Sequence, residues 1–178
     1  LVAKGYRPLI LEREVFPRFS IGESLLPQCM EYLEEAGLLE SVKGANFQKK
    51  NGAMFQRNGD YSSFDFSEQF TPGWAETFQV RRADFDKILA DKAGSLGVDI
   101  RYQHEITAVD IGEGSSLVSC VLAAGTSARF SARFLLDASG FGRVLPRLLG
   151  LEKPVDFPLR SSLFTHIEDH IQDPAFDR

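Results

Sequence analysis

The segment Arg133-Phe-Leu-Leu-Asp137-Ala-Ser-Gly140-Phe-Gly142-Arg143 joins a short apolar run to an acid, two small residues and two glycines. The run 134–136 is typical of a strand buried on both faces of a parallel sheet. The two glycines permit a positive φ and close approach of a ligand, and residues 144–149 have the composition of a helix. Ligands of open α/β sheets lie beyond the carboxyl ends of the strands, so Asp137 is expected to face a sugar or ribityl hydroxyl. An ordinary strand–turn–helix junction capped by Asp137 and Ser139 is the alternative.

A second apolar run, Pro8-Leu-Ile-Leu-Glu12-Arg13, also ends in an acid and predicts another buried strand. In dinucleotide-binding folds such an acid hydrogen-bonds the adenosine ribose and follows a glycine-rich turn by about 20 residues. Residues 1–4 and Gly5 have the pattern of a last helical turn with its C-cap glycine. We therefore expect the first strand and the GxGxxG turn to precede residue 1 in a longer protein. The alternative is a complete domain without a glycine loop.

The composition is that of an ordinary globular domain, with 43% hydrophobic and 25% charged residues among 178. The net charge of -5, without a basic run, argues against nucleic acid as a partner. No apolar run approaches the roughly 20 residues that span a bilayer, and no signal peptide opens the chain. Cys29 and Cys120 are far apart and lack metal-ligand spacing. We expect reduced, buried thiols in a cytoplasmic protein.

A polar triplet, Gly22-Glu23-Ser24, follows a proline-containing loop and precedes an apolar pair. The chain must turn sharply at Gly22. Glu23 and Ser24 offer side-chain oxygens where a helix could begin, and apolar residues then recur with helical spacing as far as Leu39. These residues predict a capped helix.

Three stretches carry a resemblance to a known family: Leu11-Glu-Arg13, Phe16-Pro-Arg-Phe19 and Ile21-Gly-Glu-Ser-Leu-Leu-Pro27. They resemble the second strand and following loop of FAD-dependent monooxygenases of the para-hydroxybenzoate hydroxylase type. They are most similar to flavin-dependent halogenases and their oxidoreductase relatives. Val80-Arg-Arg-Ala-Asp-Phe-Asp86 is similar to the family's arginine-bearing helix start, and residues 134–140 to its Asp-Gly loop.

The resemblance implies that FAD is the cofactor and assigns roles to the residues of these motifs. Glu12 would bind the adenosine ribose, Arg13 would lie beside the adenine, and Arg82 would reach the FAD. The remaining residues assigned to the cofactor are Glu23 and Ser24 in the loop, and Asp137 and Gly140 near the ribityl and pyrophosphate groups. A guanidinium at a helix start can give several fixed donors to a phosphate. An exposed Arg82 paired with Asp84 or Asp86 is the alternative.

Residues 47–66 carry alternate aromatic residues around Asn58-Gly59, a strong signal for a β-hairpin, which we expect to project over the flavin. Lys50-Asn-Gly-Ala53 is similar to a halogenase segment whose lysine is held to carry oxidised halide to the substrate. The resemblance thus implies a catalytic Lys50, whereas adjacent Lys49 favours a solvated hairpin lysine. The chain departs from halogenases at 55–58, where Phe-Gln-Arg-Asn replaces Phe-x-Trp-Gly, so hydroxylation stays open.

The remaining elements follow from local patterns. A helix over 83–96 is expected to end at Gly97, and a strand over 98–102 to pair beside the Glu12 strand. Three alternating stretches, 105–111, 117–123 and 127–134, predict a β-meander, and 161–167 predicts the first strand of a substrate-domain sheet. His166 and His170 would share a helix face as a metal pair can, but their surroundings favour a strand and we expect no metal.

These observations predict an α/β fold: a Rossmann-like, three-layer ββα FAD-binding domain with a β-meander and part of a β-rich substrate domain. Residues 1–46 and 79–150 form the FAD-binding domain, 47–78 a ribbon and 151–178 the start of the substrate domain. The implied protein is a monooxygenase or halogenase relative that acts through a flavin hydroperoxide on a small organic substrate. Its partners would be NAD(P)H or a flavin reductase, and halide. A geranylgeranyl-reductase-like enzyme that saturates a prenyl double bond and a non-catalytic nucleotide-binding scaffold are the alternatives.

Overall fold

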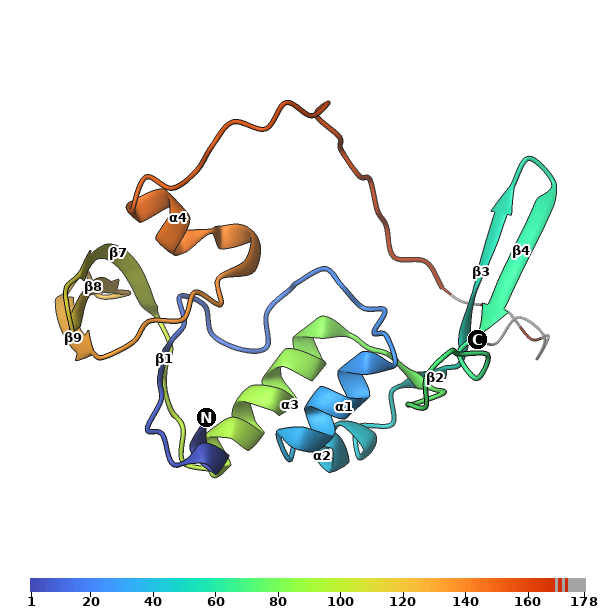
Figure 1. Ribbon diagram of the computed structural model, residues 1–178, viewed down its shortest axis with the longest axis horizontal. Helices are drawn as coiled ribbons and strands as arrows, with labels where there is room; N and C mark the ends of the chain where they lie inside the picture. Colours follow the sequence, from blue (N-terminus) through green and yellow to red (C-terminus); the bar gives the residue numbers. More distant parts are fainter. Residues whose placement is uncertain (169, 171, 173–178) are drawn as a thin grey trace. The chain divides into compact units, whose positions relative to one another are not determined.

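The computed structural model describes residues 1–168, 170 and 172, and it mixes helices with small sheets (Figure 1). These residues form two compact units. The first contains Leu1–Leu9 and Phe16–Ile100, and the second contains Ile10–Val15 and Arg101–Glu168. In the described part of the chain, no helix is long and apolar enough to cross a membrane.

Three helices enclose the core of the first unit: α1 (Gln28–Glu35), α2 (Leu39–Lys43) and α3 (Arg82–Ser95). Their inner faces, strand β5 (Thr77–Gln79) and the residue that follows it bury seven apolar side chains: Met30, Leu33, Leu39, Val42, Phe78, Val80 and Phe85. Removal of this apolar surface from water is the main force that holds the three helices together.

The single helix predicted from Glu23 and Ser24 to Leu39 is wrong at both ends. The helix begins only after Pro27, whose fixed φ suits a helix start, while Ser24 forms an antiparallel bridge to Gln79. Gly37, with φ 69°, then turns the chain into α2. A bridge between residues 55 positions apart thus overrides the local capping signal.

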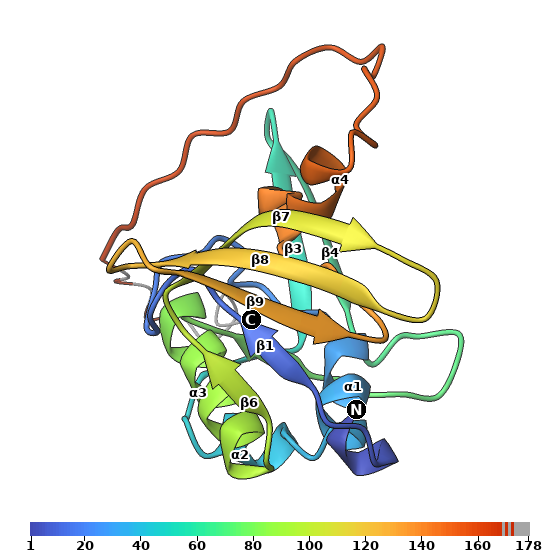
Figure 2. The same cartoon turned by 90° about the vertical axis from the view of Figure 1, so that its left-hand side faces the viewer.

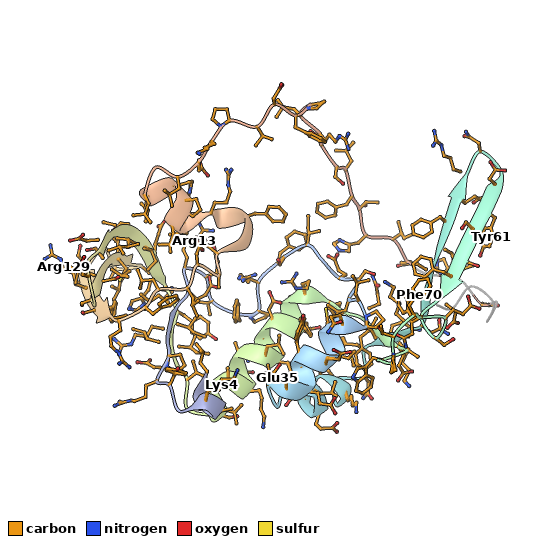
Figure 3. All side chains as sticks on the ribbon, viewed as in Figure 1. Lys4, Arg13, Glu35, Tyr61, Phe70 and Arg129 are labelled. Atoms are coloured by element: carbon orange, nitrogen blue, oxygen red, sulfur yellow. The ribbon has the colours of Figure 1, made fainter. Side chains whose placement is uncertain are left out.

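Two antiparallel pairs accompany the helices. Strand β2 (Gln48–Lys50) pairs with β5 (Thr77–Gln79), and β3 (Gly52–Arg57) pairs with β4 (Asp60–Asp65). The predicted hairpin is confirmed, because Asn58 and Gly59 have φ of 52° and 92° between β3 and β4. Two consecutive positive φ values match the twist of the flanking strands. Tyr61 projects from this hairpin (Figure 3) and is 54% exposed.

The start of the chain forms a 3-10 turn, η1 (Val2–Lys4), which Gly5 ends with φ 78° as predicted. Lys4 lies 4.0 Å from Glu35 of α1, and both side chains are 72% exposed (Figure 3). Strand β1 (Leu9–Leu11) then pairs with β6 (Asp99–Arg101). Burial of β1 was predicted wrongly, since Leu9 and Ile10 are exposed. Within the described residues this sheet contains two strands, and so small a sheet buries little of an apolar side chain.

The second unit contains the predicted meander: β7 (His104–Ile111), β8 (Ser116–Leu122) and β9 (Ser127–Ala132). Figure 2 shows the three strands side by side, and the register is antiparallel throughout. Cys120 is a buried free thiol at the centre of β8, as predicted, whereas Cys29 is only partly buried. Helix α4 (Val144–Leu148) contacts β7 and confirms the helix predicted after the glycines.

Two predicted strands are absent from the described part of the chain. The run 134–136 has no regular structure and pairs with no strand of the described residues, and Phe134 and Leu136 are 77% and 68% exposed. A parallel strand needs a neighbour to pair its main-chain groups, and the described residues provide none there. The stretch 161–167 is likewise irregular and exposed, with Leu163 99% exposed.

The residues considered for a metal pair fall at the end of the described part. His166 packs edge-on against Phe164, with ring centroids 6.1 Å apart. The accompanying Asp169 and Asp173 lie outside the described residues. Within those residues, no group of three or more His, Cys, Asp or Glu side chains could hold a metal ion.

The core predicts how the first unit responds to truncation. Met30 is 1% exposed, so Met30→Ala should lower the free energy of unfolding by about 2–5 kcal/mol through lost burial and a cavity. Tyr32→Ala, on the exposed face of the same helix, should change it by about 0.5 kcal/mol or less. Urea unfolding followed by circular dichroism measures both. Equal losses in the two variants would contradict this assignment of the core.

Candidate functional site

The segment around Glu23 and Ser24 is held to β5 as a short extra strand. The Val80 N–H donates to the Glu23 carbonyl at 2.7 Å, and the Leu25 N–H donates to the Phe78 carbonyl at 3.2 Å. The sharp turn predicted at Gly22 is confirmed by its φ of 117°. Because these bonds fix the main chain, the side chains of Glu23 and Ser24 leave it in set directions.

Arg82 occupies the first position of α3 and forms a hydrogen bond to the main chain just before Gly22. Its Nη1 donates to the Ile21 carbonyl at 2.9 Å. Its Nε and Nη2 donate to the two carboxylate oxygens of Asp86 at 2.9 and 3.1 Å. Pairing with Asp86 was the alternative noted for this arginine. Three of its five N–H groups are used in this way, so the guanidinium has donors to offer a ligand as well.

Gly22 and Arg82 fit against each other closely. A Cβ at Gly22 would lie 2.8 Å from Nη1 of Arg82, and the φ of this residue is unfavourable for any side chain. The φ value alone calls for glycine, and a side chain would in addition displace the end of the Arg82 guanidinium. The turn places the main chain of the segment directly on the guanidinium.

Sequence reasoning missed Arg18 as a member of this cluster. It also did not predict that the Asp86 side chain is mostly removed from water and binds two arginines. Arg18 Nη1 lies 3.2 Å from Asp86 Oδ2, and the Asp86 side chain is only 11% exposed. One carboxylate thus joins two arginines. The i, i+4 spacing of Arg82 and Asp86 was a usable signal, whereas Arg18 is 68 residues from its partner and carries no local one.

Lys50, at the end of β2, points its ammonium at the same segment. Nζ donates to Ser24 Oγ at 2.6 Å and to the Leu25 carbonyl at 3.3 Å, and it lies 5.2 Å from the centre of the Phe66 ring. The neighbouring Lys49 instead pairs with Glu76 at 3.0 Å, with a side chain that is 68% exposed. The description as a solvated lysine fits Lys49 and not Lys50.

Glu12 and Arg13 lie in the second unit, just beyond β1. The Glu12 N–H donates to the Arg101 carbonyl at 2.9 Å, and the Glu12 carbonyl accepts the His104 N–H at 3.0 Å. Its carboxylate accepts the Glu14 N–H at 2.8 Å, while Arg13 pairs with Glu14 at 3.1 Å. The main chain of Glu12 is therefore fixed, and its side chain stands at the carboxyl end of the strand.

Asp137 organises the junction before α4. Its Oδ1 accepts the Ser139 N–H at 2.8 Å, and its Oδ2 accepts the Leu145 N–H at 2.9 Å. Ser139 Oγ accepts the Val144 N–H at 2.9 Å, which is the capped junction considered as the alternative. Hydrogen bonds from the side chain and then the main chain of Ser139 hold the pKa of Asp137 below its usual value of 3.8. This stabilisation is present above that value and is lost as the pH falls through the lowered pKa.

The two glycines of this junction differ. Gly140 has φ 54°, and a Cβ built on it would meet nothing within 4 Å. Gly142 does not use the positive φ that a glycine permits, and Arg143, with φ 45°, makes the second left-handed turn. A Cβ at Gly142 would lie 3.3 Å from the Ser139 Cβ. Open space beside a left-handed glycine is what close approach of a ligand requires.

The structure thus brings together some of the predicted residues. Ser24 and Lys50 are in direct contact, and Arg82 holds the segment that carries Glu23 and Ser24. All of these belong to the first unit, and Glu12, Arg13, Asp137 and Gly140 belong to the second. Helix starts, strand ends and a fixed turn are places where main-chain and charged groups can meet an anionic nucleotide.

Comparison with known proteins gives a consistent result. A family model described as an FAD binding domain matches residues 1–166. The 1H-pyrrole-2-carbonyl-(peptidyl-carrier protein) chlorinase of Pseudomonas fluorescens is 32% identical over 197 residues, covering 100% of this chain and 42% of the chlorinase. A flavoprotein/dehydrogenase of Cytophaga hutchinsonii matches with a TM-score of 0.84 and 47% identity, over 88% of this chain and 39% of its own.

A hydroxylase is also similar. The anhydrotetracycline hydroxylase OxyS of Streptomyces rimosus matches with a TM-score of 0.66 and 26% identity, over 90% of this chain and 31% of its own. The chain therefore spans less than half the length of each of these three relatives.

The shared carboxylate generates a prediction. Asp86→Asn keeps the shape of the side chain but removes the charge that holds Arg18 and Arg82. We expect the free energy of unfolding to fall by about 1.5–3 kcal/mol, since hydrogen bonds between charged groups are among the strong ones. Thermal or urea unfolding measures it. The matched control is Asp91→Asn on the same helix, where the carboxylate is 61% exposed and pairs with Lys87. Its loss should stay within about 0.5 kcal/mol, and equal effects would contradict the role of Asp86.

Proposed function

The chain belongs to the FAD binding domain family, and from that premise we propose that it is the cofactor-binding part of a flavin-dependent halogenase or closely related monooxygenase. Family membership confirms FAD as the predicted cofactor and confirms a mixed helix-and-sheet fold of the FAD-binding type. The relatives are longer than this chain, so the reaction is proposed for the whole protein.

The residues present fit FAD. Glu12 would accept hydrogen bonds from the ribose hydroxyls, because its main chain is fixed at the end of β1 and its carboxylate stands beyond the strand. Arg13 would lie beside the adenine. Arg82 has N–H donors beyond those given to Ile21 and Asp86, and would direct them at the cofactor.

The remaining cofactor residues are proposed from their conformation. Gly140 would let a phosphate or ribityl group approach, since the space beside its Cα is open. Asp137 accepts hydrogen bonds from the N–H groups of Ser139 and Leu145 and from the Ser139 side chain, and a carboxylate can accept about four, so a ribityl hydroxyl can still be bound. Glu23 and Ser24 lie in the segment fixed to β5, which we assign to the flavin side.

The chemistry divides between cofactor and protein. Bound FAD supplies the redox chemistry that activates oxygen, and the protein supplies orientation and charge. Lys50 would donate a hydrogen bond to oxidised halide and direct it to an organic substrate. An ammonium has three N–H donors, and Ser24 and Leu25 take two of the three.

One observation carries the halogenase proposal most directly. Lys50 Nζ of the segment 50–53 and Ser24 Oγ of the segment 21–27 are in contact at 2.6 Å, although the two residues are 26 positions apart in the sequence. Two separate segments that resemble halogenase sequences thus meet through their side-chain atoms. Similarity to the chlorinase over the full chain supports the same proposal.

Hydroxylation is the second candidate. The similarity to a hydroxylase favours it, as does the departure from the halogenase pattern at 55–58. Neither the double-bond reductase nor the non-catalytic scaffold gains support from the three relatives named above.

The finer predictions extend this proposal. They are a Rossmann-like three-layer arrangement, the division at 46, 78 and 150, a cytoplasmic location, and electrons from NAD(P)H or a flavin reductase. The substrate would be a small organic molecule.

Glu12 provides a test of cofactor binding. Glu12→Gln preserves the shape of the side chain but weakens a charge-assisted hydrogen bond to the ribose, so FAD binding should weaken by about 1.5–3 kcal/mol. Fluorescence titration with FAD measures this in the protein that carries the chain. Glu113→Gln, in the exposed turn between β7 and β8, is the control and should leave the affinity unchanged. Unchanged affinity in Glu12→Gln would remove the ribose assignment.

Lys50 provides a test of the reaction. Lys50→Met keeps the apolar stem but removes every N–H donor, so halogenated product should disappear while FAD remains bound. Lys49→Met is the matched control on the adjacent residue and should keep product formation. Product is measured by mass spectrometry with and without chloride or bromide. Wild-type product that carries no halogen under any condition would exclude halogenation and leave hydroxylation, and halogenated product from Lys50→Met would remove Lys50 from the mechanism.

A further inference from the structure

Three groups of the first unit contact the ammonium of Lys50. Ser24 Oγ and the Leu25 carbonyl accept hydrogen bonds from it, and the Phe66 ring faces it at 5.2 Å. Oxygen acceptors and an aromatic face all attract a cation. The side chain of Lys50 is therefore directed toward the segment 22–25 and not into solvent.

A second hydroxyl stands beside Lys50 but takes no part in this arrangement. Thr77 lies directly opposite Lys50 in the β2–β5 register, and cross-strand partners are side-by-side neighbours. The hydroxyl of Thr77 is fully buried and has no hydrogen-bond partner among the described residues. Of the two hydroxyls, that of Ser24 is the one that accepts a hydrogen bond from the Lys50 ammonium.

The main chain of Ser24 is itself fixed at both ends. Glu23 and Leu25 are bonded to β5, and the turn before them rests on Arg82, which Asp86 anchors to α3. A short, rigid path therefore runs from the ion pair at the start of α3 to the hydroxyl that holds Lys50. Rigid support of this kind is what a reacting side chain needs in order to keep its geometry.

We propose that Ser24 is the positioning residue of Lys50. Its hydroxyl holds the Lys50 ammonium against the segment 22–25, so that the distance between the ammonium and this segment stays constant. This inference rests on the proposed function for its catalytic meaning, while the placement itself concerns only residues of this chain. Ser24 need not touch the substrate or the halide. Its contribution is to fix the direction of the remaining N–H donor of Lys50.

The test compares three variants in the FAD-loaded protein: Ser24→Ala, Ser24→Thr and Thr77→Val. The first removes the bonded hydroxyl, the second retains a hydroxyl at the same position, and the third removes the unbonded hydroxyl opposite Lys50. Lysine acylation by acetic anhydride is followed by mass spectrometry, with Lys49 as the reference in the same strand. This readout requires no catalytic activity.

Ser24→Ala should raise the acylation rate of Lys50 relative to Lys49 by about tenfold, because the hydrogen bond that shields the amine is lost. Ser24→Thr should restore most of the protection. Thr77→Val should leave the ratio as in the wild type. At saturating FAD, Ser24→Ala should also lower kcat for halogenated product by about 10- to 100-fold, with recovery in Ser24→Thr.

The two readouts fail separately. An unchanged Lys50 to Lys49 ratio in Ser24→Ala, or the same increase in Thr77→Val, would overturn the positioning role whatever the reaction proves to be. Wild-type protein that makes no halogenated product would overturn the proposed halogenase function, while an increased ratio in Ser24→Ala alone would still support the placement of Lys50.

Discussion

The forked ion pair between Arg82 and Asp86 is the interaction on which the candidate site depends. It holds the guanidinium so that Nη1 can donate to the Ile21 carbonyl, and Gly22 lies close against that nitrogen. Beyond the turn at Gly22, main-chain hydrogen bonds on both sides of Ser24 attach the segment to β5 and the residue after it. The Ser24 hydroxyl in turn accepts a hydrogen bond from Lys50. Because Asp86 is largely removed from water, the pair is less screened than a surface ion pair would be.

Elements with a complete local signal could be predicted from the sequence. The hairpin follows from Asn58-Gly59, since few other residue pairs accept two positive φ values, and the meander follows from alternating polarity with glycine turns. The helix at Arg82 and its end near Gly97 follow from spacing and a C-cap glycine. In each case the information lies within about a dozen residues.

Elements that depend on distant partners could not be predicted in this way. Ser24 has the side chain of a helix cap, but its bridge to Gln79 decides its conformation. The apolar run 134–136 resembles a buried strand, yet a strand is defined by its neighbours and the described residues supply none there. Lys50 likewise contacts Ser24, and Arg18 pairs with Asp86. Both contacts join residues too far apart in the sequence for a local pattern to reveal them. The resemblance of the motifs was sufficient to identify the segments, whereas the contacts between their side chains are visible only in the structure.

The close fit of Gly22 to Arg82 constrains how this sequence can change. Loss of Arg82 would remove the clash at Nη1, yet φ at residue 22 would still disfavour a side chain. A side chain at residue 22 would displace the end of Arg82 while that arginine is present, and it would remain strained by φ after the arginine is gone. Evolution can therefore place a side chain at position 22 only after the turn itself has been rebuilt, whichever residue stands at position 82.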